Sequence, residues 1–309
     1  GDAPREYASP AYLPLALISL AEIAARHPDP ETRDLSLKGE QSIWRHAARH
    51  YHRRTRRLAG PHSRIYDQAA RFPLLAVATG CDGEMGDPVA AGVGVYATAA
   101  YHPPDGLADL VLRRPCPQLL EERVEPWIAL PRYELGAVRE LVPRDGSRLR
   151  MVAHLAADAI RFRTSRTFLG ESFTVGTISE ALAGDQRNNY VLHVAVPPDR
   201  SDAVTDRILF DGRSFSHGEA HCWCWADQRN GSALLVRRLN RIAFSDPFPF
   251  SAGRADLDTP VQEASLEIRL PGWNRLEEAW AGDTALASGT AGPLGSTRFA
   301  FRVGTVWAG

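Results

Sequence analysis

The chain of 309 residues is long enough for two domains, and its hydrophobic share of 44% and charged share of 24% are ordinary for a soluble globular protein. This composition argues against intrinsic disorder. No stretch reaches the ~20 uninterrupted apolar residues of a membrane helix, so we expect no membrane partner. The net charge is only -1, but the basic residues are almost all arginine, with Lys38 the only lysine, and they crowd between Arg45 and Arg71. We therefore expect an anionic partner at that end of the chain.

A helix is predicted close to the N-terminus. Apolar residues recur at helical spacing over residues 12–26, after the start signal Ser9-Pro10. Pro28 and Pro30 are predicted to end this helix and to open a loop.

A second helix is predicted over residues 37–58, with Trp44 and Ala47 on its apolar side. Its outer side is predicted to carry His46, Arg49, Arg53 and Arg56. Two helices joined by a short connection form an αα-hairpin. A third, shorter helix is predicted over residues 66–78, and residues 93–101 fit either a strand or the end of the helical region.

From Trp127 onward the sequence changes to short β-like runs separated by Gly, Pro, Asp and Asn. The predicted strands are residues 149–155, 159–167, 173–179, 190–196, 207–210, 221–226, 232–239, 264–270 and 297–306. Helices followed by many strands, without alternation, argue against a parallel βαβ fold and indicate an antiparallel β-sandwich. We predict an α+β fold, with an α-helical region over residues 1–80 and a large antiparallel β-sandwich over residues 81–309.

The strongest candidate site is the stretch 57–67, which reads Arg-Leu-Ala-Gly-Pro-His-Ser-Arg-Ile-Tyr-Asp. Gly60-Pro61 is predicted to end the preceding helix, so an exposed loop should follow. This loop would present His62, Arg64, Tyr66 and Asp67. Loops held by a rigid scaffold often carry catalytic side chains, although a solvated, arginine-rich helix end explains the same pattern.

The helical hairpin, this loop and the long antiparallel region together resemble polysaccharide lyases that join an α/α toroid to a β-sandwich, of the heparinase II/III and alginate-lyase type. The resemblance rests on architecture and on residues 9–12, 58–66 and 173–179. A complete toroid needs more helices than this chain holds, so we expect the C-terminal portion of one, with further helices upstream. The resemblance implies β-elimination on an acidic, uronate-containing glycan by a secreted or periplasmic protein.

β-Elimination requires a cation to neutralise the uronate carboxylate, a base to remove the adjacent proton and an acid to protonate the leaving oxygen. Arg64 is expected to neutralise the carboxylate, because a guanidinium can hold a carboxylate with two hydrogen bonds. Tyr66, His62 and Tyr12 are the candidates for proton transfer. For Tyr12, a place at the edge of the core is the simpler explanation.

Substrate contacts are expected from Gln186 and Arg187, in the polar segment 184–190 between two predicted strands, and from Asp67. A hairpin turn explains that polar segment equally well. Pairing of Arg64 with Asp67 on the surface is a second structural alternative.

Four residues in and near the predicted strand 221–226 could be metal ligands. These residues are His217, His221, Cys222 and Cys224. Strand alternation puts the cysteines on the face opposite His221, and the spacing misses the usual zinc patterns, so no metal is expected there. His154 and His193 sit among apolar neighbours and are predicted to be buried and hydrogen-bonded.

Two other functions remain open. A glycoside hydrolase needs two carboxylates roughly 5–10 Å apart. The candidates are Asp82, Glu84, Asp87, Glu171, Glu180 and Asp185. A non-catalytic carbohydrate-binding or scaffold unit is the other alternative. No cofactor is expected, since the chain has no Walker loop or dinucleotide-binding fingerprint, and no nucleic-acid partner, since its basic cluster lacks a recognition-helix motif.

Overall fold

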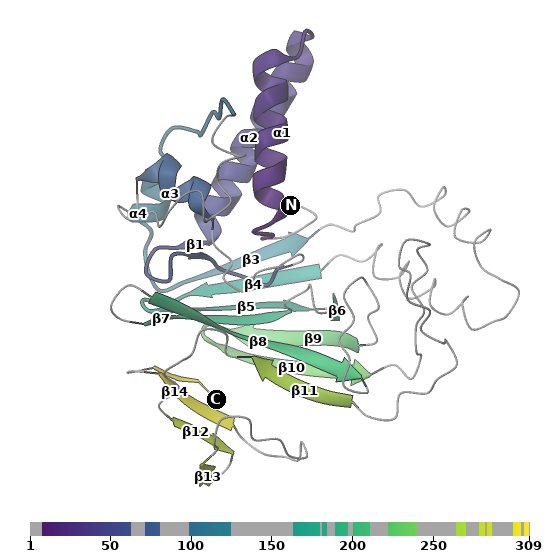
Figure 1. Cartoon of the computed structure of the whole chain (residues 1–309), viewed down its shortest axis with the longest axis vertical. Coiled ribbons are helices and arrows are strands. Elements are labelled where there is room, and N and C mark those ends of the chain that lie inside the picture. The colour runs from purple at the N-terminus through teal and green to yellow at the C-terminus, as the bar shows by residue number, and fades with distance from the viewer. Residues whose placement is uncertain are drawn as a thin grey trace, which may run out of the picture.

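The computed structural model describes residues 8–62, 72–80, 99–124, 163–179, 181–183, 189–196, 200–210, 222–239, 264–269, 278–281, 283–285, 299–303 and 306–308. These residues form a helical hairpin, two shorter helices and a set of antiparallel sheets (Figure 1). The predicted combination of helices and antiparallel strands is therefore confirmed. The predicted strand 149–155 lies outside the described residues.

The first helix, α1 (Tyr12–Arg26), has the predicted bounds. The second helix, α2 (Pro30–His50), begins and ends earlier than the predicted range 37–58. It begins at a proline in its first turn, after Asp29, whose carboxylate accepts a hydrogen bond from the backbone N–H of Thr32 at 2.9 Å. This pairing satisfies a donor that a helix N-terminus leaves free, so the prediction of a loop here was wrong.

α2 ends at His50 because the chain turns back on itself. β1 (Tyr51–His52) pairs antiparallel with β2 (Arg57–Leu58). The guanidinium of Arg114 donates to the carbonyl oxygens of Ala48 and of the first residue of β1. It places a positive charge at the negative end of the helix dipole and satisfies carbonyls that the helix leaves unpaired.

Two shorter helices, α3 (Pro73–Thr79) and α4 (Leu107–Leu112), lie beside the lower part of α2 (Figure 1). α3 falls partly within the predicted helix 66–78, and α4 was not predicted. The buried core that these helices share with the hairpin includes Leu13, Leu17, Trp44, Ala47, Leu58, Phe72, Leu75, Leu107 and Val111. The helical layer thus draws on residues both before and after position 80.

The main sheet has six strands in the order β11-β8-β7-β5-β4-β3, and every neighbouring pair is antiparallel. Its strands are β3 (Gln118–Val124), β4 (Arg163–Leu169), β5 (Phe173–Ser179), β7 (Tyr190–Val196), β8 (Arg200–Phe210) and β11 (Ala264–Arg269). The predicted bounds of β5 and β7 are confirmed.

Two smaller sheets follow. One is three-stranded, in the order β10-β9-β6, and the other is four-stranded, in the order β13-β12-β14-β15. Their strands are β6 (Ala181–Ala183), β9 (Cys222–Arg229), β10 (Ser232–Leu239), β12 (Glu278–Ala281), β13 (Thr284–Ala285), β14 (Phe299–Val303) and β15 (Val306–Ala308). β9 packs on β5, where the Gln228 side chain accepts a hydrogen bond from Thr177 at 2.7 Å and donates one to the Val175 carbonyl at 3.0 Å.

The two faces of the main sheet differ in character. The face toward β10 is apolar and carries Phe168, Val175, Leu192 and Val194. Strand alternation and register place Glu122, Thr167, Thr174 and His193 on the other face. All four are buried. The second face is therefore buried, and its polar side chains lie among apolar ones such as Leu120, Leu169 and Val191.

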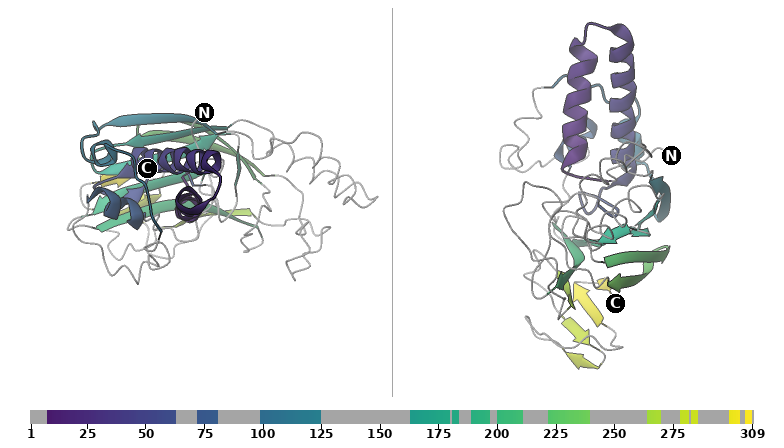
Figure 2. Two further views of the ribbon diagram at one scale, coloured as in Figure 1. Left: turned by 90° about the horizontal axis from the view of Figure 1, so that it is seen from above. Right: turned by 90° about the vertical axis from the view of Figure 1, so that its right-hand side faces the viewer.

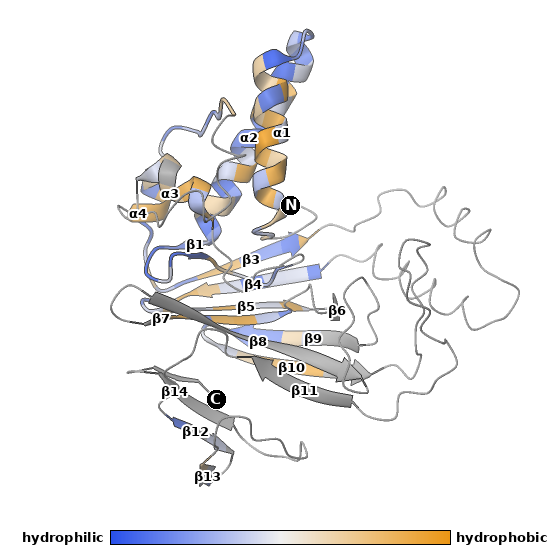
Figure 3. Ribbon diagram, in the orientation of Figure 1, coloured by the Kyte–Doolittle hydropathy of each residue, from blue (hydrophilic) through white to orange (hydrophobic). Residues whose placement is uncertain are grey.

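The hairpin meets the sheets only at one end. α1 and α2 lie side by side and project away from the sheets (Figure 2). β1 and parts of β3 and β4, where α2 ends, are hydrophilic (Figure 3). We call this region the helix–sheet junction: it comprises the end of α2, residues 59–62 and the polar face of the main sheet.

Candidate functional site

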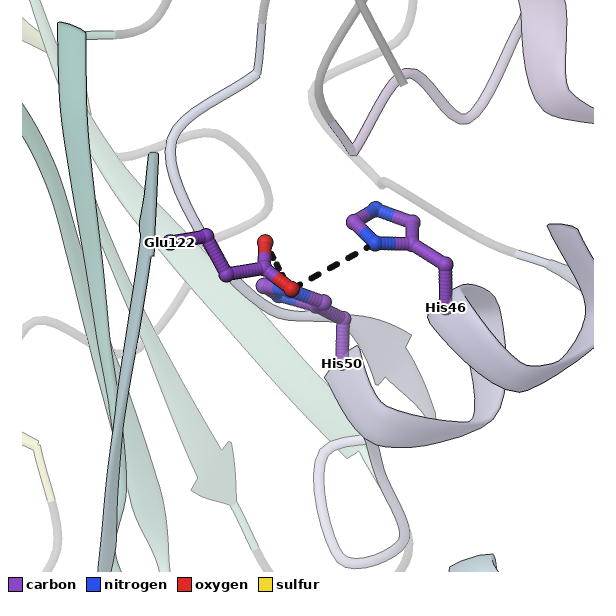
Figure 4. Close-up of side chains that lie close together, drawn as sticks. All are labelled: His46, His50 and Glu122. Atoms are coloured by element: carbon purple, nitrogen blue, oxygen red, sulfur yellow. Dashed lines mark hydrogen bonds and ion pairs between the residues drawn. The ribbon is translucent and has the colours of Figure 1, made fainter. Parts of the chain in front are cut away.

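Two histidines on α2 and a glutamate on β3 converge at the helix–sheet junction. His46 and His50 are one turn apart, so their side chains share a helix face, and both point toward Glu122 (Figure 4). His50 Nε2 lies 2.9 Å from Glu122 Oε2, and His46 Nδ1 lies 3.6 Å from Glu122 Oε1. Each residue offers one nitrogen or oxygen atom as a potential ligand, and these three atoms all lie within 4.8 Å of one another. We call these three residues the His–His–Glu cluster.

The cluster is shut off from solvent. His46 is 3% exposed, His50 1% and Glu122 9%. The structure corrects the prediction that His46 lies on the outer side of α2. That prediction assumed that the polar side of the helix faces water along its whole length, whereas the last turns of α2 lie against the main sheet.

The second ring nitrogen of His50 is held by the backbone. His50 Nδ1 lies 3.1 Å from the carbonyl oxygen of Ala59. A carbonyl can only accept a hydrogen bond, so Nδ1 carries the hydrogen and donates it. This contact fixes the orientation of the ring and directs Nε2 toward Glu122.

Electrostatics favour an ionised Glu122. Burial by itself raises the pKa of the Glu122 carboxyl, but the neighbouring imidazoles of His46 and His50 outweigh it and hold that pKa below its usual value. Burial lowers the pKa of His46, so this ring is neutral at pH 7. Both nitrogens of His46 and Glu122 Oε1 are buried without a hydrogen-bond partner. Glu122 Oε1 has only long ionic contacts, with His46 Nδ1 at 3.6 Å and with the guanidinium of Arg49 at 3.8 Å.

Two glycines allow the loop after β2 to touch the sheet. A side chain at Gly176, on β5, would overlap the backbone of Gly60, whose φ is +127°. At Gly60 itself, a Cβ atom would lie 3.3 Å from His50 Nδ1. The close approach brings the Ala59 carbonyl to His50 and carries the loop onward to His62.

His62, the candidate base from the sequence, is fully buried rather than exposed on a loop. Its Nδ1 donates to the carbonyl oxygen of Ala8 at 2.6 Å, while Nε2 has no partner. Burial lowers the pKa of His62 to about 4, so the ring is neutral at pH 7. It holds the N-terminal segment against the sheet in this structure.

His193 lies beside His62, with ring centroids 5.9 Å apart. Its predicted burial is confirmed, but the prediction that it is hydrogen-bonded was wrong, because neither ring nitrogen has a partner. Burial lowers the pKa of His193 well below its usual value, with a further contribution from the positive charge of Arg57. Two neutral imidazoles therefore lie next to each other on the polar face of the sheet.

An open pocket lies on the other side of the β1–β2 turn and has a volume of about 290 Å³. It is lined by Tyr51, His52, Arg53, Arg54, Val111, Leu112, Arg114, Cys116 and Glu171. We call it the arginine pocket. Its volume is at the lower end of the range for small-molecule sites.

The arginine pocket carries an excess of positive charge, since three guanidinium groups face one carboxylate. Arg53 and Arg54 are exposed, and within the described residues neither forms an ion pair. Arg114 is anchored by backbone carbonyls, and none of the described acids pairs with it. Burial lowers the pKa of Arg114 to about 10, which leaves it charged at neutral pH.

The other residues predicted from the sequence are only partly described. Tyr12 begins α1 and is half-buried, and its backbone N–H is capped by the Ser9 hydroxyl at 3.1 Å. It is not part of the His–His–Glu cluster and does not line the arginine pocket. Glu171 lines the arginine pocket. The remaining candidates lie outside the described residues: Arg64, Tyr66, Asp67, Asp82, Glu84, Asp87, His154, Glu180, Asp185, Gln186, Arg187, His217 and His221.

Sequence reasoning missed the His–His–Glu cluster, although one signal was present. The spacing His-x-x-x-His over positions 46–50 places two imidazoles on one helix face. His46 was predicted to lie on the outer side of the helix and no role was assigned to His50, and β3, which supplies Glu122, was not predicted.

No protein-family model, curated protein or solved structure matches this chain. In the part of the chain that the structure describes, no helix is both long and apolar enough to cross a membrane.

Proposed function

We propose that this protein binds an acidic, uronate-containing glycan and cleaves it by β-elimination. The arginine pocket is the observation that carries the proposal. It combines a volume suited to a small ligand with a positive charge that the surrounding described residues leave largely unbalanced.

The geometry of the pocket suits a carboxylate better than a neutral sugar. Guanidinium groups bind carboxylates through paired, charge-assisted hydrogen bonds. Arg53 and Arg54 are exposed on the β1–β2 turn and pair with no acid among the described residues, while Arg114 adds a fixed charge at the end of α2. Tyr51 adds an aromatic ring to the lining. A uronate ring offers a carboxylate for the arginines.

In β-elimination, neutralising the carboxylate acidifies the adjacent C–H. The base then takes that proton, the glycosidic C–O bond breaks and an acid protonates the leaving oxygen. Arg53 and Arg54 perform the first task in this proposal. Tyr66 and Arg64, which follow the helix–sheet junction in the sequence, remain the candidates for proton transfer and for a further carboxylate contact.

The proposal also includes the finer architecture. The projecting hairpin of α1 and α2 suits one pair of helices of an α/α toroid. The packing of β9 and β10 on the apolar face of the main sheet suits a β-sandwich. In that arrangement the helix–sheet junction and the arginine pocket lie where toroid and sandwich meet.

Incubation with a panel of uronate-containing polysaccharides tests the proposal. Elimination leaves an unsaturated sugar that absorbs in the ultraviolet, and we expect this absorbance to rise with time. Release of reducing ends without that absorbance would show a glycoside hydrolase instead. Binding without either signal would show a non-catalytic carbohydrate-binding unit.

A further inference from the structure

We propose that His46, His50 and Glu122 bind a divalent transition-metal ion of the zinc type, which joins the helical hairpin to the main sheet. This site makes no use of the arginine pocket, so the proposal is independent of the glycan-cleaving function.

The donor set is the first argument. Two imidazoles and one carboxylate are a common ligand set for Zn²⁺ and for other divalent transition metals, whereas Mg²⁺ and Ca²⁺ prefer oxygen ligands. The His-x-x-x-His spacing on α2 supplies two ligands from one helix face, and β3 supplies the third.

The distances are the second argument. Ligands about 2.1 Å from a tetrahedral ion lie about 3.4 Å from one another. Here His50 Nε2 is 2.9 Å from Glu122 Oε2 and His46 Nδ1 is 3.6 Å from Glu122 Oε1, and one donor atom of each residue lies within 4.8 Å of the other two. These separations are close to those that ligands of one ion require.

The surroundings of His50 are the third argument. Metal-binding histidines almost always donate their other ring N–H to a carboxylate, a carbonyl or water. His50 Nδ1 donates to the Ala59 carbonyl at 3.1 Å, so its Nε2 is directed toward the ion. Gly60 and Gly176 permit the loop contact that places this carbonyl.

The unpaired atoms are the fourth argument. Within the described chain, Glu122 Oε1 and both ring nitrogens of His46 are buried without a hydrogen-bond partner. Buried polar groups in folded proteins are nearly always paired, and an ion coordinated by His46 Nδ1 and Glu122 Oε1 supplies a close partner for both. Without it, the nearest cation to Glu122 Oε1 besides His46 is the guanidinium of Arg49, at 3.8 Å.

The location points to a structural role. The cluster is buried, and the two ligands that flank the ion, His50 and Glu122, are 72 positions apart in the chain. An ion there links α2 to β3 and closes a long loop, which stabilises the folded state. Residues 47 and 48, between the two histidines, are alanines, so no general base for metal-assisted hydrolysis lies in that stretch.

The test uses the full chain without a polyhistidine tag, stripped of metal with a chelator. Titration with Zn²⁺, followed by calorimetry, should show about one tightly bound ion per chain, and the melting temperature should rise with Zn²⁺ but not with Mg²⁺. Co²⁺ bound in place of Zn²⁺ should give the visible absorption of a low-coordinate site with nitrogen and oxygen ligands. This measurement uses the unaltered protein, so it does not depend on whether a variant folds.

Two variants and a matched control locate the site. Loss of a contact outside the ligand shell typically weakens metal binding about 10- to 100-fold. Glu122→Gln and His46→Gln remove ligands, so each should weaken Zn²⁺ binding by more than that. His102→Gln should not, although His102 also pairs with a buried carboxylate of α2, that of Glu40, at 3.0 Å. The proposal is overturned if the stripped protein binds no stoichiometric Zn²⁺ and forms no such Co²⁺ complex. Equal Zn²⁺ affinity in the Glu122→Gln variant and the unaltered chain also overturns it.

Discussion

Acidification should destabilise the protein through His62. The folded state holds this imidazole neutral, with a pKa of about 4, whereas the ordinary value is 6.5. Between those values the unfolded chain takes up a proton that the folded chain does not, so the free energy of unfolding must fall as the pH falls. The part of the folding stability that depends on a neutral His62 is fully present above pH 6.5 and is lost as the pH falls to 4.

The size of this loss follows from the pKa difference. One pKa unit corresponds to about 1.4 kcal/mol, so titration of His62 removes about 3 kcal/mol by pH 4. Because the ring is completely buried, no reduction for solvent screening is needed. A loss of this size is a large part of the stability of an ordinary domain.

Urea unfolding of the unaltered chain and of His62→Asn, at several pH values between 7 and 4, measures the effect. The asparagine side chain keeps an N–H donor for the Ala8 carbonyl but has no ionisable group. We expect the stability gap between the two proteins to shrink by about 3 kcal/mol from pH 7 to pH 4. A difference in stability that stays constant with pH would show that folding does not lower the pKa of His62, and the reasoning would fail.

Two further predictions concern the fold. Gly176→Ala should destabilise the protein by about 1–3 kcal/mol, because the added methyl group overlaps the backbone of Gly60. Gly39→Ala lies inside α2, where the added methyl group makes only an ordinary contact with a flexible side chain, so it should instead stabilise the protein by about 0.5–1 kcal/mol. Thermal unfolding of both variants compares them. Equal effects would contradict the close packing of the loop on β5. Asp29→Ala should lower the stability through loss of the cap of α2, as measured by chemical unfolding, while the exposed Asp34→Ala should change little. A loss at Asp34 as large as that at Asp29 would argue against the capping role.

Local patterns were enough to predict several elements of the fold. α1 follows a clear 3.6-residue period between a start signal and a proline, and its predicted bounds are confirmed. β5, β7 and β10 also have their predicted bounds, since each is a short run between turn residues. These elements are specified by their own residues.

The end of α2 depends on residues far away in the chain. Helical periodicity continues past His50, but Arg114, more than 60 positions later, takes up the terminal carbonyls. No local pattern contains that contact, so the predicted helix was too long.

The candidate site could not be assembled from the sequence for a similar reason. Placing polar residues outside is correct for a helix that faces water, but the last turns of α2 lie against a sheet. Glu122 lies on a strand with charged neighbours, which is typical of an exposed edge, and yet it is buried against His46 and His50. His62 is buried because two glycines, 116 positions apart, let the loop approach the sheet.

Affinity for acidic glycans is the most direct test of the proposed function. Calorimetric titration with a uronate oligosaccharide, and with the same oligosaccharide after reduction of its carboxyl groups, separates charge recognition from general sugar binding. We predict that the acidic form binds and the reduced form does not. The double variant Arg53→Gln/Arg54→Gln should lose roughly 10- to 100-fold in affinity, while Arg26→Gln, at the far end of the hairpin, should lose none. Equal binding of both oligosaccharides, or an unchanged affinity in the double variant, would contradict an arginine pocket built for a uronate.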